Sequence, residues 1–178
     1  MDNETATPGA APAQAATPDD LRHMRRALEL ARAGDAKAGA SPIGCVIVLD
    51  GEVVAEGHNE VGLRHDPTAH AEMVAIRAAG AKISDMELRG ATLYSTLQPC
   101  GMCTMASIWS KVGRVVFGAG RADVHPMYFE ARHVDTLTFI GDAYRDDIEI
   151  EGGCLRDECA KFYYGPDTVL PKEEQANL

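Results

Sequence analysis

The chain has few aromatic residues, few basic residues and no long apolar run. Aromatic side chains make up 6% of its 178 residues, and 17 Lys and Arg stand against 27 Asp and Glu, for a net charge of −10. No apolar segment approaches the roughly 18 residues that a membrane helix needs. We therefore expect no membrane partner. Because an acidic surface repels polyphosphate, the charge balance also disfavours a nucleic-acid partner.

The N-terminal segment also lacks the basic start and continuous apolar stretch of a secretory signal. Residues 1–17 are rich in Ala, Pro and Thr and carry almost no large apolar side chain. Such a segment cannot offset the entropy of ordering, so we expect a disordered tail. The expected location is cytoplasmic, where the five cysteines would be thiols or metal ligands rather than disulfides.

Helix caps, turn residues and apolar periodicity predict one domain over residues 18–165, followed by a polar C-terminal tail over 166–178. Strands alternate with helices after an initial hairpin turned by Asp50-Gly51, which favours an α/β fold with a mixed sheet and helices on both faces. The expected strands are 43–49, 52–55, 91–97, 114–119 and 148–151. The expected helices are 17–34, one opened by Asp66 as N-cap, 99–109, 136–144 and 155–164, with 121–132 irregular.

Two short segments carry residues suited to metal chemistry, His70-Ala71-Glu72 and Pro99-Cys100-Gly101-Met102-Cys103. Two thiolates and one neutral imidazole would give zinc three protein ligands and leave the fourth tetrahedral position open to water, as in catalytic zinc sites. A helix N-terminus would favour the thiolates. Glu72 is the candidate base for that water. Because His70 and Glu72 are two residues apart, both reach one centre only if their helix points at it end-on.

Two simpler interpretations of the cysteine pair fit less well. A redox Cys-x-x-Cys motif would leave His70 and Glu72 unexplained. A structural zinc site needs a second close pair, whereas Cys154 and Cys159 are five residues apart and Cys45 stands alone. The two segments together therefore favour a catalytic zinc site.

The pattern His-x-Glu followed by Pro-Cys-x-x-Cys is typical of zinc nucleobase deaminases. On this pattern, the chain resembles the cytidine deaminase-like superfamily over about residues 19–164. The resemblance implies a three-layer α/β/α sandwich around a central five-stranded mixed sheet, one Zn²⁺ cofactor, and a homodimer or higher homo-oligomer. It also implies site residues: His70, Cys100 and Cys103 as zinc ligands, Glu72 as the catalytic proton shuttle, and Asn59 and the backbone of Ala71 as contacts to the substrate ring.

The resemblance leaves the substrate open between two classes. Residues 65–72, 113–119 and 157–160 are similar to bacterial tRNA adenosine deaminases. Against that reading, residues 121–178 hold 6 Lys/Arg and 13 Asp/Glu, whereas an RNA enzyme needs cations along the backbone path. The favoured hypothesis is therefore hydrolytic deamination of a free nucleobase or a similar heterocycle, with release of ammonia. Guanine, cytosine and s-triazines such as azacytosine or ammeline are the candidate substrates. A non-catalytic zinc-binding module is a third reading.

Two further features bear on substrate choice. Trp109 lies six residues after Cys103, where guanine deaminases are similar, and its ring could stack on a flat heterocycle or fill the core. Residues 123–130 offer polar groups that could recognise an amino or keto edge, although each would equally suit a surface loop.

Overall fold

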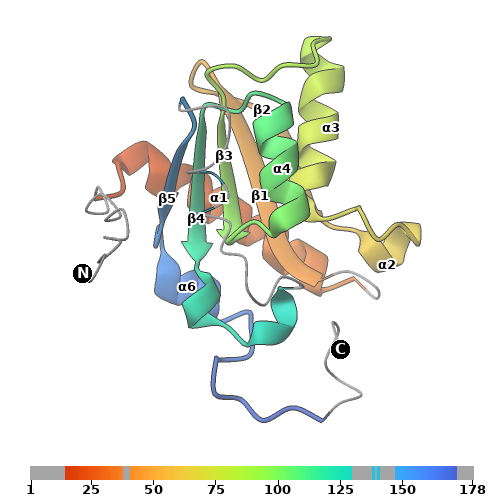
Figure 1. Ribbon diagram of the computed structural model, residues 1–178, viewed down its shortest axis with the longest axis vertical. Coiled ribbons are helices and arrows are strands. Elements are labelled where there is room, and N and C mark those ends of the chain that lie inside the picture. Colours follow the sequence, from red (N-terminus) through yellow and green to blue (C-terminus); the bar gives the residue numbers. More distant parts are fainter. Residues whose placement is uncertain (1–14, 38–40, 130–137, 139, 141–146, 172–178) are drawn as a thin grey trace, which may run out of the picture.

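A five-stranded sheet forms the centre of the molecule, in the order β2-β1-β3-β4-β5 (Figure 1). The computed structural model describes residues 15–37, 41–129, 138, 140 and 147–171. The strands are β1 (Ser41–Leu49), β2 (Glu52–Asn59), β3 (Thr92–Leu97), β4 (Arg114–Ala119) and β5 (Glu149–Gly152). Strand β1 pairs antiparallel with β2 and β3, whereas β4 pairs parallel with β3 and β5. The predicted mixed sheet is confirmed.

Helices cover both faces of this sheet (Figure 1). Helices α1 (Pro18–Asp35) and α6 (Arg156–Ala160) pack on one face, and α3 (Ala71–Ile83) and α4 (Gly101–Trp109) lie on the other. Each side has its own apolar cluster: Met24 and Leu28 of α1 meet one, and Ala75 and Ala79 of α3 meet the other. The three-layer α/β/α sandwich expected from the resemblance is therefore confirmed.

Helix α1 begins at the start of the predicted helix 17–34, with Thr17 as its N-cap. The Thr17 side chain accepts from the backbone of Asp20, the Asp20 side chain accepts from the backbone of Thr17, and Pro18 occupies the first helical position. This reciprocal cap satisfies two N–H groups that a helix start leaves without partners.

The hairpin between β1 and β2 turns at Asp50-Gly51, as predicted. Both residues have positive φ, 52° and 80°, which is the backbone that a two-residue type I′ turn requires and that Gly adopts at little cost. Strand β2 continues to Asn59, four residues beyond the prediction, because β1 pairs with it along its length, from Leu49↔Glu52 to Ser41↔Asn59. Asn59 therefore stands at the end of the strand, where the loop towards α3 begins.

The predicted start of the helix near Asp66 is wrong. The Asp66 side chain accepts from both the backbone N–H and the hydroxyl of Thr68, which closes a local turn. A short helix, α2 (Val61–Arg64), precedes that turn, and α3 begins only at Ala71, with His70 as its N-cap.

Helix α4 likewise begins two residues later than predicted, at Gly101, with Cys100 as N-cap. Each helix therefore starts on a residue of the metal-binding motif.

The C-terminal part agrees with prediction only in outline. Strand β5 is confirmed, α6 is shorter than the predicted helix 155–164, and two short 3-10 helices, η1 (Arg121–Asp123) and η2 (Pro126–Tyr128), follow β4. The predicted helix 136–144 falls almost wholly outside the described residues, as do 1–14 of the N-terminal tail and 172–178 of the C-terminal tail. Among the described residues, no helix is both long enough and apolar enough to cross a membrane.

Candidate metal and catalytic site

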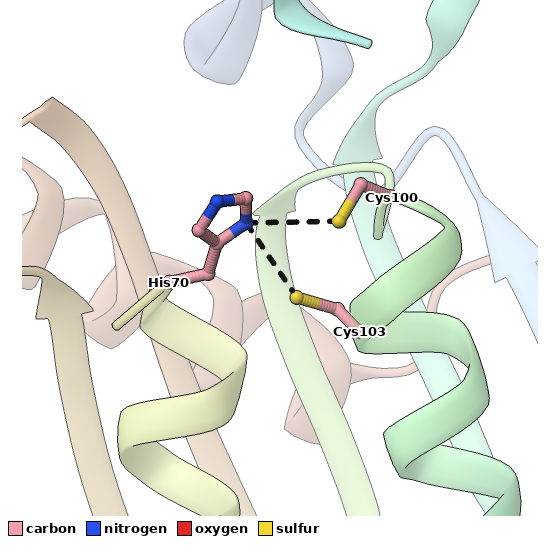
Figure 2. Close-up of side chains that lie close together, drawn as sticks. All are labelled: His70, Cys100 and Cys103. Carbon is pink, nitrogen blue, oxygen red and sulfur yellow. Dashed lines mark hydrogen bonds between the residues drawn. The ribbon is translucent and has the colours of Figure 1, made fainter. Parts of the chain in front are cut away.

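Three potential metal ligands meet where α3 and α4 begin (Figure 2). His70 is the N-cap of α3, Cys100 is the N-cap of α4, and Cys103 lies in the first turn of α4. The His70 Nδ1 atom is 3.6 Å from Cys100 Sγ and 3.7 Å from Cys103 Sγ. The three ligand atoms all lie within 4.8 Å of one another.

The spacing of these atoms fits zinc. With Zn–S near 2.3 Å and Zn–N near 2.0–2.1 Å, a tetrahedral ion places its sulfur and nitrogen ligands about 3.6 Å apart. The observed separations of 3.6 and 3.7 Å match that value. The donor set also suits zinc, because thiolate and imidazole are the ligands that it prefers, and three of them leave one position open.

The two helix starts favour negative charge at the cysteines. Neither His70 nor Cys100 makes a side-chain capping hydrogen bond, and the first N–H groups of a helix create positive potential at that end. The hydrogen bond from Cys103 and that with His70 lower the pKa of the Cys100 thiol to about 4, against the opposing effect of burial. Cys100 is therefore prepared to bind a metal as a thiolate.

Glu72 lies beside this group in the first turn of α3 and is only 4% exposed. Its Oε1 accepts from the hydroxyl of Ser95 at 3.0 Å, and its Oε2 accepts from the thiol of Cys103 at 3.5 Å. Burial raises the pKa of the Glu72 carboxyl, and the negative charge of Cys100 raises it further. Because His70 is the extended cap and Glu72 follows in the first turn, the helix meets the site end-on, as the spacing required.

Asn59 and Ala71 also lie at this end of the sheet. Ala71 is fully buried between His70 and Glu72, and Asn59 is 6% exposed at the end of β2. The backbone N–H of Glu60 donates to the carbonyl of Ala69 at 2.9 Å, which ties the residue after Asn59 to the residue before His70. The structure thus connects Asn59 to the metal-binding loop.

Trp109 is not brought to this group. It ends α4, six residues beyond Cys103, which corresponds to about 9 Å along a helix axis. Its side chain is 76% exposed. Within the described chain, the indole therefore neither lines the space around His70 nor fills the core.

The polar groups of residues 123–129 have partners within the protein. Asp123 accepts from the backbone of Gly120 and pairs with Arg156, and the Nδ1 atom of His125 accepts from the backbone of Met127. The hydroxyl of Tyr128 accepts from the backbone of Tyr164. These contacts fold the segment onto the C-terminal region, and Glu130 lies outside the described residues.

Ser95 is the main site residue that sequence reasoning missed. It lies in the middle of β3 and is fully buried. Strand alternation places Ser95 on the same face as Leu93, which packs towards α3, but alternation alone does not identify Glu72 as the partner of its hydroxyl.

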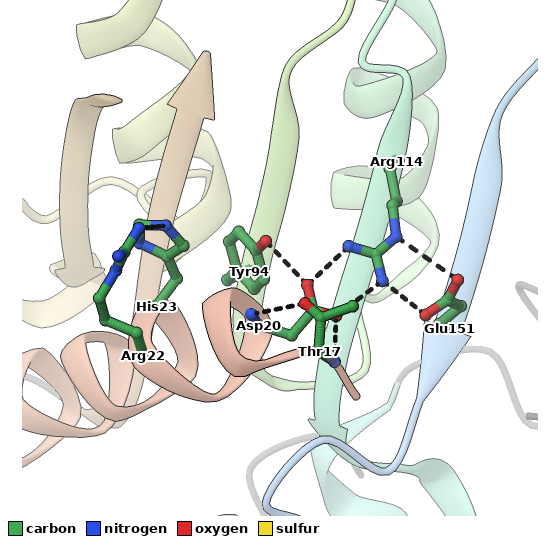
Figure 3. Close-up of polar contacts among 7 residues, drawn as sticks. All are labelled: Thr17, Asp20, Arg22, His23, Tyr94, Arg114 and Glu151. Atoms are coloured by element: carbon green, nitrogen blue, oxygen red, sulfur yellow. Dashed lines mark hydrogen bonds and ion pairs between the residues drawn. The ribbon is translucent and has the colours of Figure 1, made fainter. Parts of the chain in front are cut away.

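A second buried polar cluster, around Asp20 of α1, lies on the α1 side of the sheet (Figure 3). The Asp20 carboxylate accepts two hydrogen bonds from Arg114, at 2.6 and 3.1 Å, and one from the Tyr94 hydroxyl at 2.9 Å. Arg114 also pairs with Glu151 of β5 at 2.6 Å. Burial would raise the pKa of Asp20, but these hydrogen bonds outweigh it and hold the pKa well below its usual range. The cluster ties α1 to β3, β4 and β5.

Among known proteins, a tRNA-specific adenosine deaminase is similar to this chain along nearly its whole length. It is 35% identical over 164 residues to the tRNA-specific adenosine deaminase of Bacillus subtilis, covering 90% of this chain and 95% of the relative. A solved tRNA:A34 deaminase that edits A to I at the wobble position superposes with a TM-score of 0.68 at 31% identity, covering 79% of this chain and 98% of the other. The guanine deaminase of B. subtilis is 38% identical, but over 107 residues, covering 60% of this chain and 69% of the relative.

These similarities overturn two expectations, that the substrate is a free nucleobase and that a nucleic-acid partner is disfavoured. Both expectations rested on charge counted along the sequence, the net charge of −10 and the acidic excess of residues 121–178, and such counts do not tell which charges lie around the site.

The profile of the cytidine and deoxycytidylate deaminase zinc-binding region matches residues 17–119. That span contains α1 to α4, four of the five strands, the three potential metal ligands and Glu72. The chain belongs to the zinc-binding cytidine and deoxycytidylate deaminase family.

Proposed function

We propose that the protein hydrolyses the exocyclic amine of an adenosine in tRNA, which yields inosine and ammonia. The observation that carries the proposal is the buried Glu72 carboxylate beside the His70, Cys100 and Cys103 group, in a chain that is similar to a tRNA-specific adenosine deaminase over 90% of its length. We assign the zinc to those three ligands and the proton transfers to Glu72.

Zinc, when bound, supplies a Lewis acid that makes a water molecule more acidic. Glu72 accepts a proton from this water at Oε2, the oxygen that faces Cys103, while the Ser95 hydroxyl holds Oε1 at 3.0 Å. A carboxyl with a raised pKa suits this work, because the group must both take and return a proton near neutral pH.

Water adds to C6 of the adenine, and the proton taken by Glu72 is delivered to ring nitrogen N1. A second proton, from the added hydroxyl, passes through Glu72 to the amino group. The C6–N bond breaks, ammonia leaves, and a carbonyl remains, so one carboxylate serves both steps. Asn59 and the backbone of Ala71, which lie at the same end of the sheet, hold the ring by hydrogen bonds.

The test is inosine and ammonia formation from a tRNA anticodon stem-loop that carries one unpaired adenosine. We expect turnover by the zinc-loaded protein and loss of several orders of magnitude in Glu72→Ala with its zinc content unchanged, since general acid–base catalysis contributes about 10²–10⁴-fold. Glu87→Ala is the matched control, because Glu87 lies in the loop after α3 and pairs with Arg89 at the surface.

Two substrate controls decide between RNA and free-base chemistry. A stem-loop with guanosine in place of the adenosine should release no ammonia, and binding of the adenosine stem-loop should weaken steeply as salt rises. Ammonia release from free guanine or adenine, with none from the stem-loop, would refute the proposal. A Glu72→Ala protein with a nearly normal rate would refute the assigned role of Glu72.

A further inference from the structure

His58 stands at the end of β2, immediately before Asn59, and is 8% exposed. Its Nε2 atom is 2.8 Å from the Nζ atom of Lys37, and its Nδ1 atom is 3.1 Å from the carbonyl oxygen of Asn59. The ring therefore links a lysine after the end of α1 to the backbone of Asn59.

The chemistry of the lysine fixes which ring nitrogen carries the hydrogen. An ammonium group has three donors and no acceptor, so Nε2 of His58 must accept from Lys37. A neutral imidazole then carries its hydrogen on Nδ1, the atom that faces the carbonyl of Asn59. The carboxylate of Glu60 lies 3.7 Å from the same Nδ1, farther than that carbonyl oxygen. Lys37 thus selects the tautomer that donates to Asn59.

Gly34 allows the imidazole ring of His58 to pack against the end of α1. A Cβ atom at Gly34, in the last turn of α1, would lie 3.2 Å from Cβ and 3.4 Å from Cγ of His58. The 3.2 Å distance is tighter than an ordinary contact, so glycine lets the helix end and the imidazole pack closely together. The end of α1 and the end of β2 are therefore held together at His58.

The two oxygen atoms of Asn59 each accept a hydrogen bond within the protein. The backbone oxygen accepts from His58, and the side-chain Oδ1 accepts from the backbone N–H of Val61 at 3.2 Å. In the described part of the chain, no group accepts from the Asn59 Nδ2 group. With Oδ1 committed, the amide presents Nδ2 as a donor, which would suit an acceptor atom on a heterocyclic ring.

We infer that Lys37 and His58 are positioning residues for Asn59: they fix the backbone from which its side-chain amide donates to the substrate ring. The inference rests on the proposed function for the role of Asn59, and it goes beyond that function by assigning two residues that touch neither metal nor substrate. Lys37 acts only through His58, and His58 acts only through Asn59.

The first test is Lys37→Met, which removes the charge and the donor but keeps most of the side chain. We expect KM for the stem-loop to rise roughly fivefold, with kcat and zinc content little changed, because one hydrogen bond that orders a binding group is lost. Lys82→Met is the matched control, since Lys82 donates to the carbonyl of Val53 on the same strand, away from Asn59. An equal effect of both variants would show a general loss of charge and would overturn the inference.

A double-mutant series separates positioning from direct contact with RNA. In an Asn59→Ala background, Lys37→Met should cause no further loss, because there is no amide left to orient. If Lys37→Met still raises KM roughly fivefold there, Lys37 contacts the RNA itself, and the inference fails. His58→Asn, whose Nδ2 can replace the Nδ1 donor without needing the lysine, should retain more activity than His58→Phe and should be insensitive to Lys37→Met.

A readout without turnover keeps this test independent of the proposed function. The Asn59 side-chain amide signals in a ¹H–¹⁵N spectrum, assigned by their loss in Asn59→Ala, should shift or broaden in Lys37→Met and stay unchanged in Lys82→Met. Absence of stem-loop turnover with this shift would refute the function and leave the positioning intact. Turnover with no change in these signals would refute the positioning.

Discussion

Replacing Gly44 with alanine should destabilise the protein severely without altering any polar group of the site. Gly44 lies in β1 directly beneath α1, and a Cβ atom there would stand 2.0 Å from the carbonyl oxygen of Ala27 and 2.7 Å from the backbone nitrogen of Ala31. Both neighbours are helix backbone, so no side chain can rotate away. The helix itself must move by more than 1 Å to restore a normal contact of about 3.3 Å or more.

The magnitude follows from that displacement. Over-packing that side chains can relieve costs about 1–3 kcal/mol, and here the Met24 and Leu28 contacts of α1 with the core must be disturbed as well. We therefore expect Gly44→Ala to lower the free energy of unfolding by at least about 3 kcal/mol, and the melting temperature by about 6–12 °C for a chain of this size.

Urea denaturation of the zinc-loaded protein, followed by far-UV circular dichroism, measures this effect. Gly113→Ala is the matched control, because a Cβ there meets its nearest atoms at 3.5 Å, an ordinary contact. It should lie within about 1 kcal/mol of the wild type. Equal midpoints for the two variants would show that β1 and α1 do not approach as closely as the structure places them.

Three other perturbations have defined outcomes. Asp20→Asn should cost about 3–5 kcal/mol at pH 7, because it leaves Arg114 short of a buried partner. Since the folded pKa of Asp20 lies below its unfolded value, this stabilisation is complete above about pH 4 and fades as pH falls further; urea midpoints of both proteins should therefore converge towards pH 2, and a constant gap would contradict this. Ser95→Ala should lower kcat about tenfold at normal zinc content, since Glu72 loses its only hydroxyl donor among the described residues; unchanged steady-state rates would contradict it. Chelation should abolish turnover and added Zn²⁺ should restore it, whereas Mg²⁺, which prefers oxygen ligands, should not.

The sequence predicted the parts of the fold that depend on local chemistry. The start of α1 near Thr17, the Asp50-Gly51 turn and the alternation of strands and helices were readable because each depends on residues close together in the chain. The group of His70, Cys100 and Cys103 was predicted from its ligand chemistry together with the resemblance to a known motif, and the structure brings these three side chains together.

Features that depend on three-dimensional register were not readable. The hydrogen bond from Ser95 to Glu72 requires β3 to lie beneath the first turn of α3, which no local pattern encodes. Trp109 shares a helix with Cys103, but six residues of helical rise place it at the opposite end. The expectation of a free nucleobase was wrong because charges counted along the sequence do not tell which of them lie around the site.

Helices α3 and α4 begin on residues that stabilise a helix start poorly, because neither N-cap side chain makes a capping hydrogen bond. Serine, threonine, aspartate or asparagine at positions 70 and 100 would cap these helices better than the histidine and cysteine that occupy them. Each such change would also replace an imidazole or thiolate that zinc prefers as a ligand. The first turns of α3 and α4 are therefore less stable than better N-caps would make them. We expect the protection of their amides from hydrogen exchange to depend more on metal content than that of any other part of the molecule.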